Sequence, residues 1–242
     1  MYDTVHALHD IIPFSNELLW LLFALVNFGF VLLIYKLFGK TGMFAWIAFA
    51  SVLLNIQVTK TIELFGITAT LGNVMFGSIF LVTDALNEKY GLVNAKRAVY
   101  IGFFSIISMA VIMQAAIWFA PAPKDFAHES LVTIFEVVPR LVLGSILAYI
   151  ISQLIDVHLF QRIKKRFASN RTLYVRNLGS TLFSQLIDTA IFVPIAFLGI
   201  HATPELISIW LTTYIIKVLV AFLDTPFVYL IKQVRPISWN DE

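Results

Sequence analysis

The stretch LGSILAYIISQLIDVHLF, residues 143–160, contains the feature that decides the fold. It is predominantly apolar, yet its second half carries Gln153 and Asp156. The five residues SQLID at 152–156 occur again, unchanged, at 184–188, inside a second apolar run, LFSQLIDTAIFVPIAF. About 20 predominantly apolar residues span a bilayer as a helix. We therefore expect two membrane-spanning helices that carry the same polar pair.

The composition of the whole chain is that of an integral membrane protein. Of the 242 residues, 59% are hydrophobic and 13% are charged, whereas a soluble domain is about a quarter charged. The mean hydropathy is +0.85. The net charge of +2 does not indicate nucleic-acid binding, because the basic residues fall mostly between the apolar runs. The absence of Cys excludes disulfides, thiolate metal sites and cysteine nucleophiles.

Apolar runs of membrane-spanning length recur along the chain. They lie at residues 17–38, 43–60, 70–90, 98–119, 136–160, 178–199 and 206–231. We predict an all-α integral membrane protein, a compact bundle of about seven transmembrane helices that forms a single domain over 1–242. Residues 1–42 would supply an extra N-terminal helix beside a six-helix core at 43–232. No Lys or Arg precedes Lys36, so the first run lacks the basic flank of a cleavable signal peptide and is expected to remain as a helix.

The Lys and Arg residues predict the orientation, because cytoplasmic loops of membrane proteins are enriched in them. Thirteen fall at one end of the predicted helices and three at the other, while Lys217 lies inside the last run. The three are Lys60, Lys124 and Arg140. We therefore expect a multi-pass protein of the cell membrane with its N-terminus outside and its C-terminus in the cytoplasm.

Polar residues inside the runs are the candidate functional residues, since such residues usually face a cavity, a partner or a transport pathway. Each SQLID copy places its Gln and Asp three positions apart, on one helix face. In antiparallel helices both Gln side chains would lie about 12 Å inside the cytoplasmic boundary, with an Asp on either side. The candidate substrate-binding residues are Asn55, Gln57, Asp84, Glu88, Gln153, Asp156, Gln185, Asp188 and Lys217.

Several of these polar residues also have a structural interpretation. A buried Gln can bridge two helices through hydrogen bonds, and small residues at four-residue spacing, the serines of both SQLID copies included, favour close helix packing. Asp84 and Glu88 could be a helix-end pair whose charge is balanced by Lys89. Lys217 could be the counter-ion of Asp224 or of another Asp.

The residue types favour a small polar solute as the ligand. Carboxylates, amides, one Lys and nearby aromatic rings occur together, without an Arg cluster for phosphate or a His cluster for metal. A guanine-like edge suits this set, because its adjacent N–H donors fit one carboxylate and its carbonyl needs an amide or ammonium donor. An amino acid or a vitamin would also fit. No cofactor, metal or nucleic-acid partner is expected, only a purine-like substrate and the lipid bilayer, and a homodimer stays open.

Three motifs carry a family resemblance: T-D-x-x-x-E-x-Y-G at 83–91, Q-x-x-D-V-H at 153–158 and S-T-L-F-x-x-x-x-D at 180–188. With YIIKVLVAFL at 214–223 they resemble the queuosine precursor transporter family, also called the vitamin uptake transporter family, over roughly residues 45–232. The resemblance implies a six-helix protein that takes up 7-cyano-7-deazaguanine and 7-aminomethyl-7-deazaguanine, bases salvaged for queuosine in transfer RNA. Carried over by position, the polar residues of the family are Asn55, Asp84, Gln153, Asp156, Gln185, Asp188 and Lys217.

Two other functions stay open at this point. The chain could be the substrate-binding component of an energy-coupling-factor importer, which would need a separate ATPase because the sequence has no G-x-x-x-x-G-K-[ST] phosphate loop. It could also be an intramembrane enzyme that uses paired Asp residues, although its five His residues are scattered and it has no H-E-x-x-H or G-x-S-x-G motif.

Overall fold

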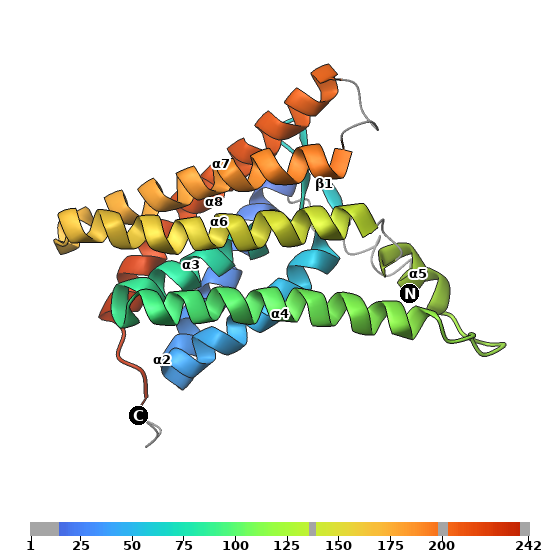
Figure 1. Cartoon of the computed structure of the whole chain (residues 1–242), viewed down its shortest axis with the longest axis horizontal. Helices are drawn as coiled ribbons and strands as arrows, with labels where there is room; N and C mark the ends of the chain where they lie inside the picture. Colours follow the sequence, from blue (N-terminus) through green and yellow to red (C-terminus); the bar gives the residue numbers. More distant parts are fainter. Residues whose placement is uncertain (1–14, 136–138, 198–202, 238–242) are drawn as a thin grey trace.

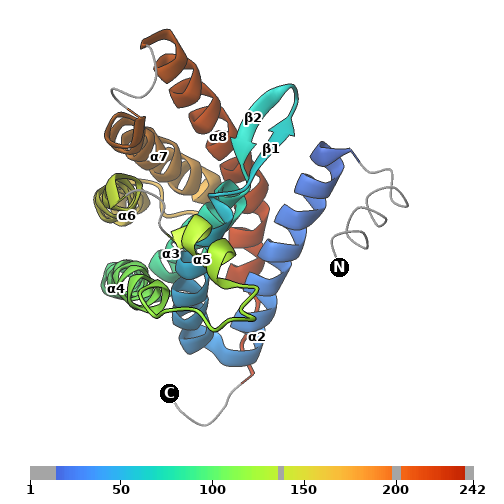
Figure 2. The same ribbon diagram turned by 90° about the vertical axis from the view of Figure 1, so that its right-hand side faces the viewer.

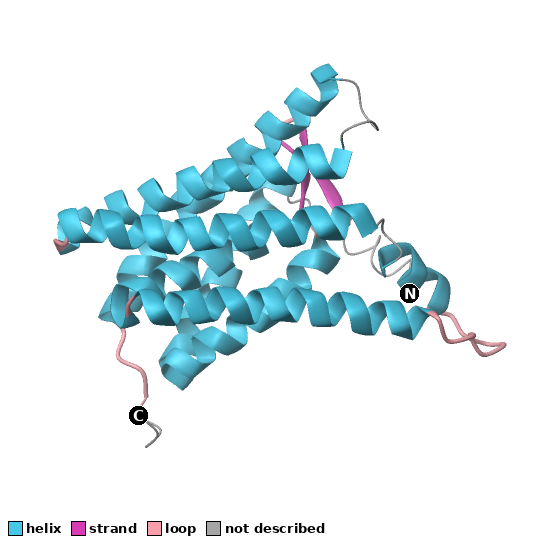
Figure 3. Cartoon of the chain, viewed as in Figure 1, coloured by secondary structure: helices cyan, strands magenta, loops and turns pink. Residues whose placement is uncertain are grey.

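The structure, a computed structural model, describes residues 15–135, 139–197 and 203–237. These residues form a helical bundle with one short β-hairpin (Figures 1 and 3). The helices are α2 (Asn16–Gln57), α3 (Gly72–Tyr90), α4 (Leu92–Ile117), α5 (His128–Phe135), α6 (Pro139–Arg166), α7 (Leu173–Phe197) and α8 (Thr203–Gln233), and a 3-10 turn, η1 (Asn170–Thr172), precedes α7. The helical class predicted from the sequence is confirmed.

Among the described residues, five stretches are long and apolar enough to cross a membrane. They are Asn16–Gln57, Leu92–Ile117, Leu143–Arg166, Asn170–Ala196 and Leu206–Gln233, which lie in α2, α4, α6, α7 and α8. The first of them, α2, is two antiparallel segments rather than one rod. A straight helix of 42 residues would be about 63 Å long. Yet Asn16 Nδ2, at its start, donates to the carbonyl of Glu63, just beyond its end, over 3.1 Å.

The reversal in α2 occurs at Gly39, whose φ of 57° and ψ of −139° are not helical. A side chain there would be strained because φ is positive, and it would lie 3.4 Å from Pro236 of the C-terminal segment. The two halves of α2 correspond to the predicted runs 17–38 and 43–60 (Figure 2).

A β-hairpin follows α2 where the sequence predicted the end of a helix and a connection. Strand β1 (Thr61–Leu64) pairs antiparallel with β2 (Ile67–Thr70). Phe65 and Gly66 form the turn with φ values of 53° and 74°, and two consecutive positive φ values are typical of tight two-residue hairpins. The second run therefore ends at Gln57, and Lys60 lies in the turn after it.

Helix α3 is the interior helix of the bundle. Its residues 72–87 are buried without a break, and it packs against α2, α4, α6 and α8 (Figure 2). Gly77 brings α3 close to α8, since a Cβ there would lie 2.0 Å from Val220 Cγ1. The predicted run 70–90 matches α3 in extent, but α3 is not among the five long apolar stretches.

Helices α6 and α7 lie side by side and antiparallel, joined through η1 (Figures 1 and 2). Gly144 permits the close approach, because a Cβ at this position would lie 3.1 Å from Ile195 Cγ2. Helix α4 begins six residues before the predicted run 98–119. Residues 136–138 and 198–199 of the predicted runs lie outside the described residues.

The short helix α5 was not predicted. Its first turn is capped by Asp125, whose Oδ1 accepts from the backbone N–H groups of Ala127 and His128 over 2.7 and 2.9 Å. These hydrogen bonds stabilise the carboxylate and lower the pKa of Asp125 below its usual value.

Candidate functional site: a polar cluster between α3, α6, α7 and α8

The two SQLID copies face each other and exchange hydrogen bonds. Ser152 Oγ donates to Asp188 Oδ1 over 3.1 Å, and Ser184 Oγ donates to Asp156 Oδ1 over 2.9 Å. The Ser of each copy thus holds the Asp of the other. The sequence assigned both serines to helix packing, and the structure adds a hydrogen bond to each. The two bonds fix the register, which places Gln153 and Gln185 about 3 Å apart along the helix axes.

The two Gln side chains carry hydrogen-bonding atoms that the described part of the protein does not use. Both residues are fully buried. Gln153 Oε1 accepts from Thr83 Oγ1 over 3.3 Å, while its Nε2 has no partner in the described part of the chain. Neither amide atom of Gln185 has one there. Buried polar atoms normally have partners, so this amide pair is suited to a ligand that supplies donors and acceptors.

Asp84 of α3 completes the cluster from the interior helix. Its Oδ2 accepts from Thr181 Oγ1 over 3.1 Å, and its carboxyl adjoins that of Asp156. Asp84 Oδ1 and Asp156 Oδ2 accept no hydrogen bond from the described residues. Two carboxyls and two amides, each with free capacity, therefore converge from α3, α6 and α7.

Lys217 of α8 forms an ion pair with Asp188. Its Nζ also lies 4.5 Å from the ring centroid of Phe76, which packs edge-on against Phe80 at 5.1 Å. Of the two counter-ions considered for Lys217, the structure therefore gives Asp188 rather than Asp224.

Asp224 is a fourth buried Asp in the interior of the bundle, and it was not among the candidates predicted from the sequence. Asn177 Nδ2 lies 3.3 Å from Asp224 Oδ1 and 3.0 Å from Thr225 Oγ1. Thr83, Thr181 and Asn177 were missed as well. Their partners depend on how each helix is rotated, and short polar side chains inside a membrane helix give no indication of it.

Asn55 and Gln57 lie in the last turn of α2, beside the hairpin. Asn55 Nδ2 donates to the Ser51 carbonyl of its own helix over 2.8 Å, and the buried Gln57 Oε1 has no partner within the described ranges. No hydrogen bond between described residues joins either side chain to the other candidates. The structure therefore brings six candidates together in the α3–α6–α7–α8 interior and leaves these two at the hairpin end.

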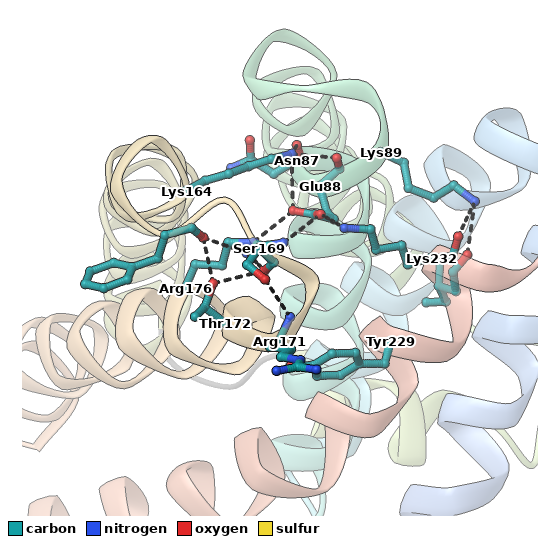
Figure 4. A network of polar contacts seen from close by, with 12 residues as sticks. Asn87, Glu88, Lys89, Lys164, Ser169, Arg171, Thr172, Arg176, Tyr229 and Lys232 are labelled. Carbon is teal, nitrogen blue, oxygen red and sulfur yellow. Dashed lines mark hydrogen bonds and ion pairs between the residues drawn. The ribbon is translucent and has the colours of Figure 1, made fainter.

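Glu88 is the centre of a separate network at the opposite end of the bundle (Figure 4). Arg176 Nε and Nη2 donate to its two carboxylate oxygens over 2.9 and 2.8 Å, and Lys164 Nζ lies 3.2 Å from Oε2. Lys232 forms a third ion pair with it. Arg176 is fully buried and also donates to the carbonyls of Phe167 and Ser169 over 2.8 and 2.9 Å. One carboxylate thus joins α3, α6, α7 and α8.

Lys89, the partner considered for Glu88, bonds elsewhere. Its Nζ donates to the carbonyls of Ile231 and Val234, at the end of α8, over 3.1 and 2.9 Å. It also lies 4.6 Å from the ring centroid of Tyr35. The helix-end interpretation of Glu88 therefore holds with different partners, and sequence proximity alone indicated the wrong cation.

The sequence of this chain is similar to those of known membrane proteins. Residues 70–231 match the model of a family described as "putative vitamin uptake transporter". A Bacillus subtilis protein named "Probable queuosine precursor transporter" is 48% identical over 227 residues, 94% of this chain and 98% of that protein. A Haemophilus influenzae protein of the same name is 29% identical over 133 residues, 55% of this chain and 54% of that protein. The Escherichia coli "Queuosine precursor transporter" is 27% identical over 143 residues, 59% of this chain and 62% of that protein. No solved structure matches.

Proposed function

This chain belongs to the vitamin uptake transporter family and is a membrane transporter, and we propose that it imports queuosine precursors for the modification of transfer RNA. The observation that carries the proposal is the 48% identity to the B. subtilis protein over 98% of that protein's length. The sequence resemblance indicates 7-cyano-7-deazaguanine and 7-aminomethyl-7-deazaguanine as the bases carried. Because the chain belongs to a transporter family, the alternative of an intramembrane enzyme is no longer considered.

The polar cluster supports a substrate site for a guanine-like base. The free oxygens of Asp84 and Asp156 could accept the adjacent N–H donors of such a base, and a Gln amide could donate to its carbonyl. Asp188 and Lys217 complete the proposed site. Their ion pair joins α7 to α8 and so holds the part of α7 that carries Gln185 in position. Asn55 and Gln57 would contact the base on its way in from the hairpin end. Glu88 stays a candidate, but its three ion pairs favour a role in holding helices together.

We also propose seven membrane crossings, with the N-terminus outside and the C-terminus in the cytoplasm. The two antiparallel halves of α2, together with α3, α4, α6, α7 and α8, supply these crossings. One end of the bundle is rich in basic residues, as the cytoplasmic side of a membrane protein is. They include Lys89, Lys164, Arg176 and Lys232.

The test of the function uses cells that cannot synthesise the precursor and that lack their own transporter. With this protein, and with either base in the medium, queuosine should appear in transfer RNA. Cells that express the Asp84→Leu variant at the same membrane level should show little. Membrane-inserted wild-type protein that restores no queuosine would refute the proposed substrate.

A second test separates a self-sufficient carrier from the substrate-binding component of a larger importer. Purified protein in liposomes should move the base without any ATPase present. Its mass in detergent would also show whether the homodimer left open by the sequence forms.

A further inference from the structure

Three buried carboxyls in this bundle form no ion pair with a described Lys or Arg. Asp84, Asp156 and Asp224 are each exposed by 1% or less, and no Lys or Arg of the described ranges forms an ion pair with them. Two other acidic residues of the bundle, Asp188 and Glu88, differ in this respect. Asp188 is paired with Lys217, and Glu88 has three cations around it.

One face of α7 holds all three carboxyls through neutral donors. Asn177, Thr181 and Ser184 lie at positions i, i+4 and i+7, so they follow one stripe of the helix. They contact Asp224 of α8, Asp84 of α3 and Asp156 of α6 over 3.3, 3.1 and 2.9 Å. We call these three donors and three carboxyls the α7 file. Hydroxyl and amide donors orient a carboxylate but do not neutralise its charge.

The three carboxyls of the α7 file also act on one another. Asp84 interacts electrostatically with both Asp156 and Asp224, and Asp156 interacts with Asp224. Neighbouring carboxylates disfavour one another's charge, and isolated charges are costly at membrane depth. Three ionised groups without a cation are therefore unfavourable, and binding of a proton by the file relieves this repulsion.

Asp224 is the member of the file that no proposed substrate contact uses. The charged groups that face it are Asp84 from α3 and Asp156 from α6, and α7 contributes the neutral Asn177. Lys217, on its own helix, lies two turns away and is bonded to Asp188. Within the described parts of α2 and β2, no charged group acts on Asp224.

We propose that Asp224 is a proton-binding site that couples the inward movement of the substrate to an inward flow of protons. This inference rests on the proposed function. A carboxylate of the Asp84–Asp156 pair can accept two N–H donors of the base only when it is ionised, so base binding requires its proton to move to Asp224. There the proton forms a neutral carboxylic acid. It leaves to cytoplasmic water after the base has left, and the cycle closes when the Asp84–Asp156 pair takes up a new proton from the outside.

The test uses purified full-length protein in liposomes and 7-cyano-7-deazaguanine, which is neutral. The lumen is made about one pH unit more alkaline than the medium, and the membrane potential is clamped at zero. With one proton per base, wild-type protein should accumulate the base up to about tenfold. Asp224→Asn should only equilibrate it, while exchange of labelled for unlabelled base across the membrane continues. Asp125→Asn, a change in the exposed α4–α5 connection, should accumulate base like the wild type.

Three outcomes distinguish a failure of proton coupling through Asp224 from a failure of the proposed transport function. Wild-type exchange without gradient-driven accumulation would overturn the inference and leave the proposed function standing. Normal accumulation by Asp224→Asn would show that Asp224 is structural, which also overturns it. Absence of both exchange and binding of the base by wild-type protein would instead refute the proposed function. If Asp224→Asn does not fold, a pH dye inside wild-type liposomes decides, since base added outside should acidify the lumen.

Discussion

At the scale of single residues, the repeated SQLID is explained by the two bonds that its copies exchange. The sequence identified the important positions, because a Gln or Asp in an apolar run stands out whatever the rotation of the helix. It could not identify their partners. Ser152 and Ser184 are small enough to pass for packing residues, yet each donates to an Asp of the facing helix. Asn177 and Thr181 lie in a less apolar part of α7, where a polar residue does not by itself predict a functional site.

The amide of Gln185 leads to a prediction at this scale. A buried amide without partners costs about 1–3 kcal/mol, so Gln185→Leu should leave the thermal stability unchanged or raise it. The same substitution should abolish uptake, because it removes a ligand contact. The measurements are the melting temperature of the purified protein and uptake by cells with equal amounts in the membrane.

Gln233→Leu, a change at the exposed end of α8, is the control for composition and should behave as wild type in uptake. A lower melting temperature with normal uptake by Gln185→Leu would identify Gln185 as a helix bridge instead of a ligand-binding residue.

At the scale of helices and strands, long apolar runs were predicted well and their ends were not. Burial of an apolar surface defines the body of a helix, whereas its ends depend on capping and tertiary contacts. The β-hairpin at residues 61–70 illustrates the limit. Its turn residues, Phe65 and Gly66, continue an apolar pattern, and only their positive φ values reveal a turn. Asp125 did carry a usable sign of the turn that leads into α5, since Asp is favoured in turns where its side chain bonds the backbone two residues on.

The contact between α3 and α8 predicts the effect of a single methyl group. Gly77→Ala would place Cβ 2.0 Å from Val220 Cγ1, and such overpacking costs about 1–3 kcal/mol. The melting temperature should fall, and the double variant Gly77→Ala with Val220→Ala should recover much of the loss. Gly29→Ala is the matched control, because nothing lies within 4 Å of a Cβ there. Equal losses from both glycine variants would contradict the proposed clash.

The Glu88 network predicts a loss of stability rather than of affinity. Glu88→Gln would leave the fully buried Arg176 without its carboxylate, and breaking a buried pair in this way costs about 3–5 kcal/mol. The melting temperature should drop strongly while the dissociation constant for the base, measured on folded protein, stays the same. Glu88→Gln combined with Arg176→Gln should recover part of the stability. Weaker binding by a stably folded Glu88→Gln would instead support the original assignment of Glu88 to the substrate site.

At the scale of the whole molecule, the two ends of the bundle differ in chemistry. One end carries the Glu88 network, and the other carries the hairpin and α5 (Figure 1). The distribution of Lys and Arg in the sequence indicated this asymmetry without the structure. The sequence could not show that the basic residues of several helices meet around a single carboxylate.

The natural absence of Cys makes the orientation directly testable. Ala122→Cys lies in the exposed α4–α5 connection and Ala168→Cys in the exposed α6–α7 connection. A membrane-impermeant maleimide should label Ala122→Cys in intact cells and Ala168→Cys only after the membrane is opened. The reverse pattern would invert the proposed topology, and labelling of both in intact cells would contradict an intervening membrane.

The burial of α3 has a consequence for biogenesis. An Asp at the centre of a helix disfavours insertion from the translocon by about 2.5–3.5 kcal/mol, and α3 carries Asp84 among its 19 residues. The hydrogen-bond donor to Asp84 is Thr181 of α7, and α6 and α8 also pack against α3. The ribosome has not yet made these three helices when α3 emerges. The nascent chain must therefore keep α3 near the translocon until its second half arrives. A ribosome that stalls before α8 would leave the middle of this protein without a stable place in the membrane, and the unfinished chain would be a substrate for membrane proteases.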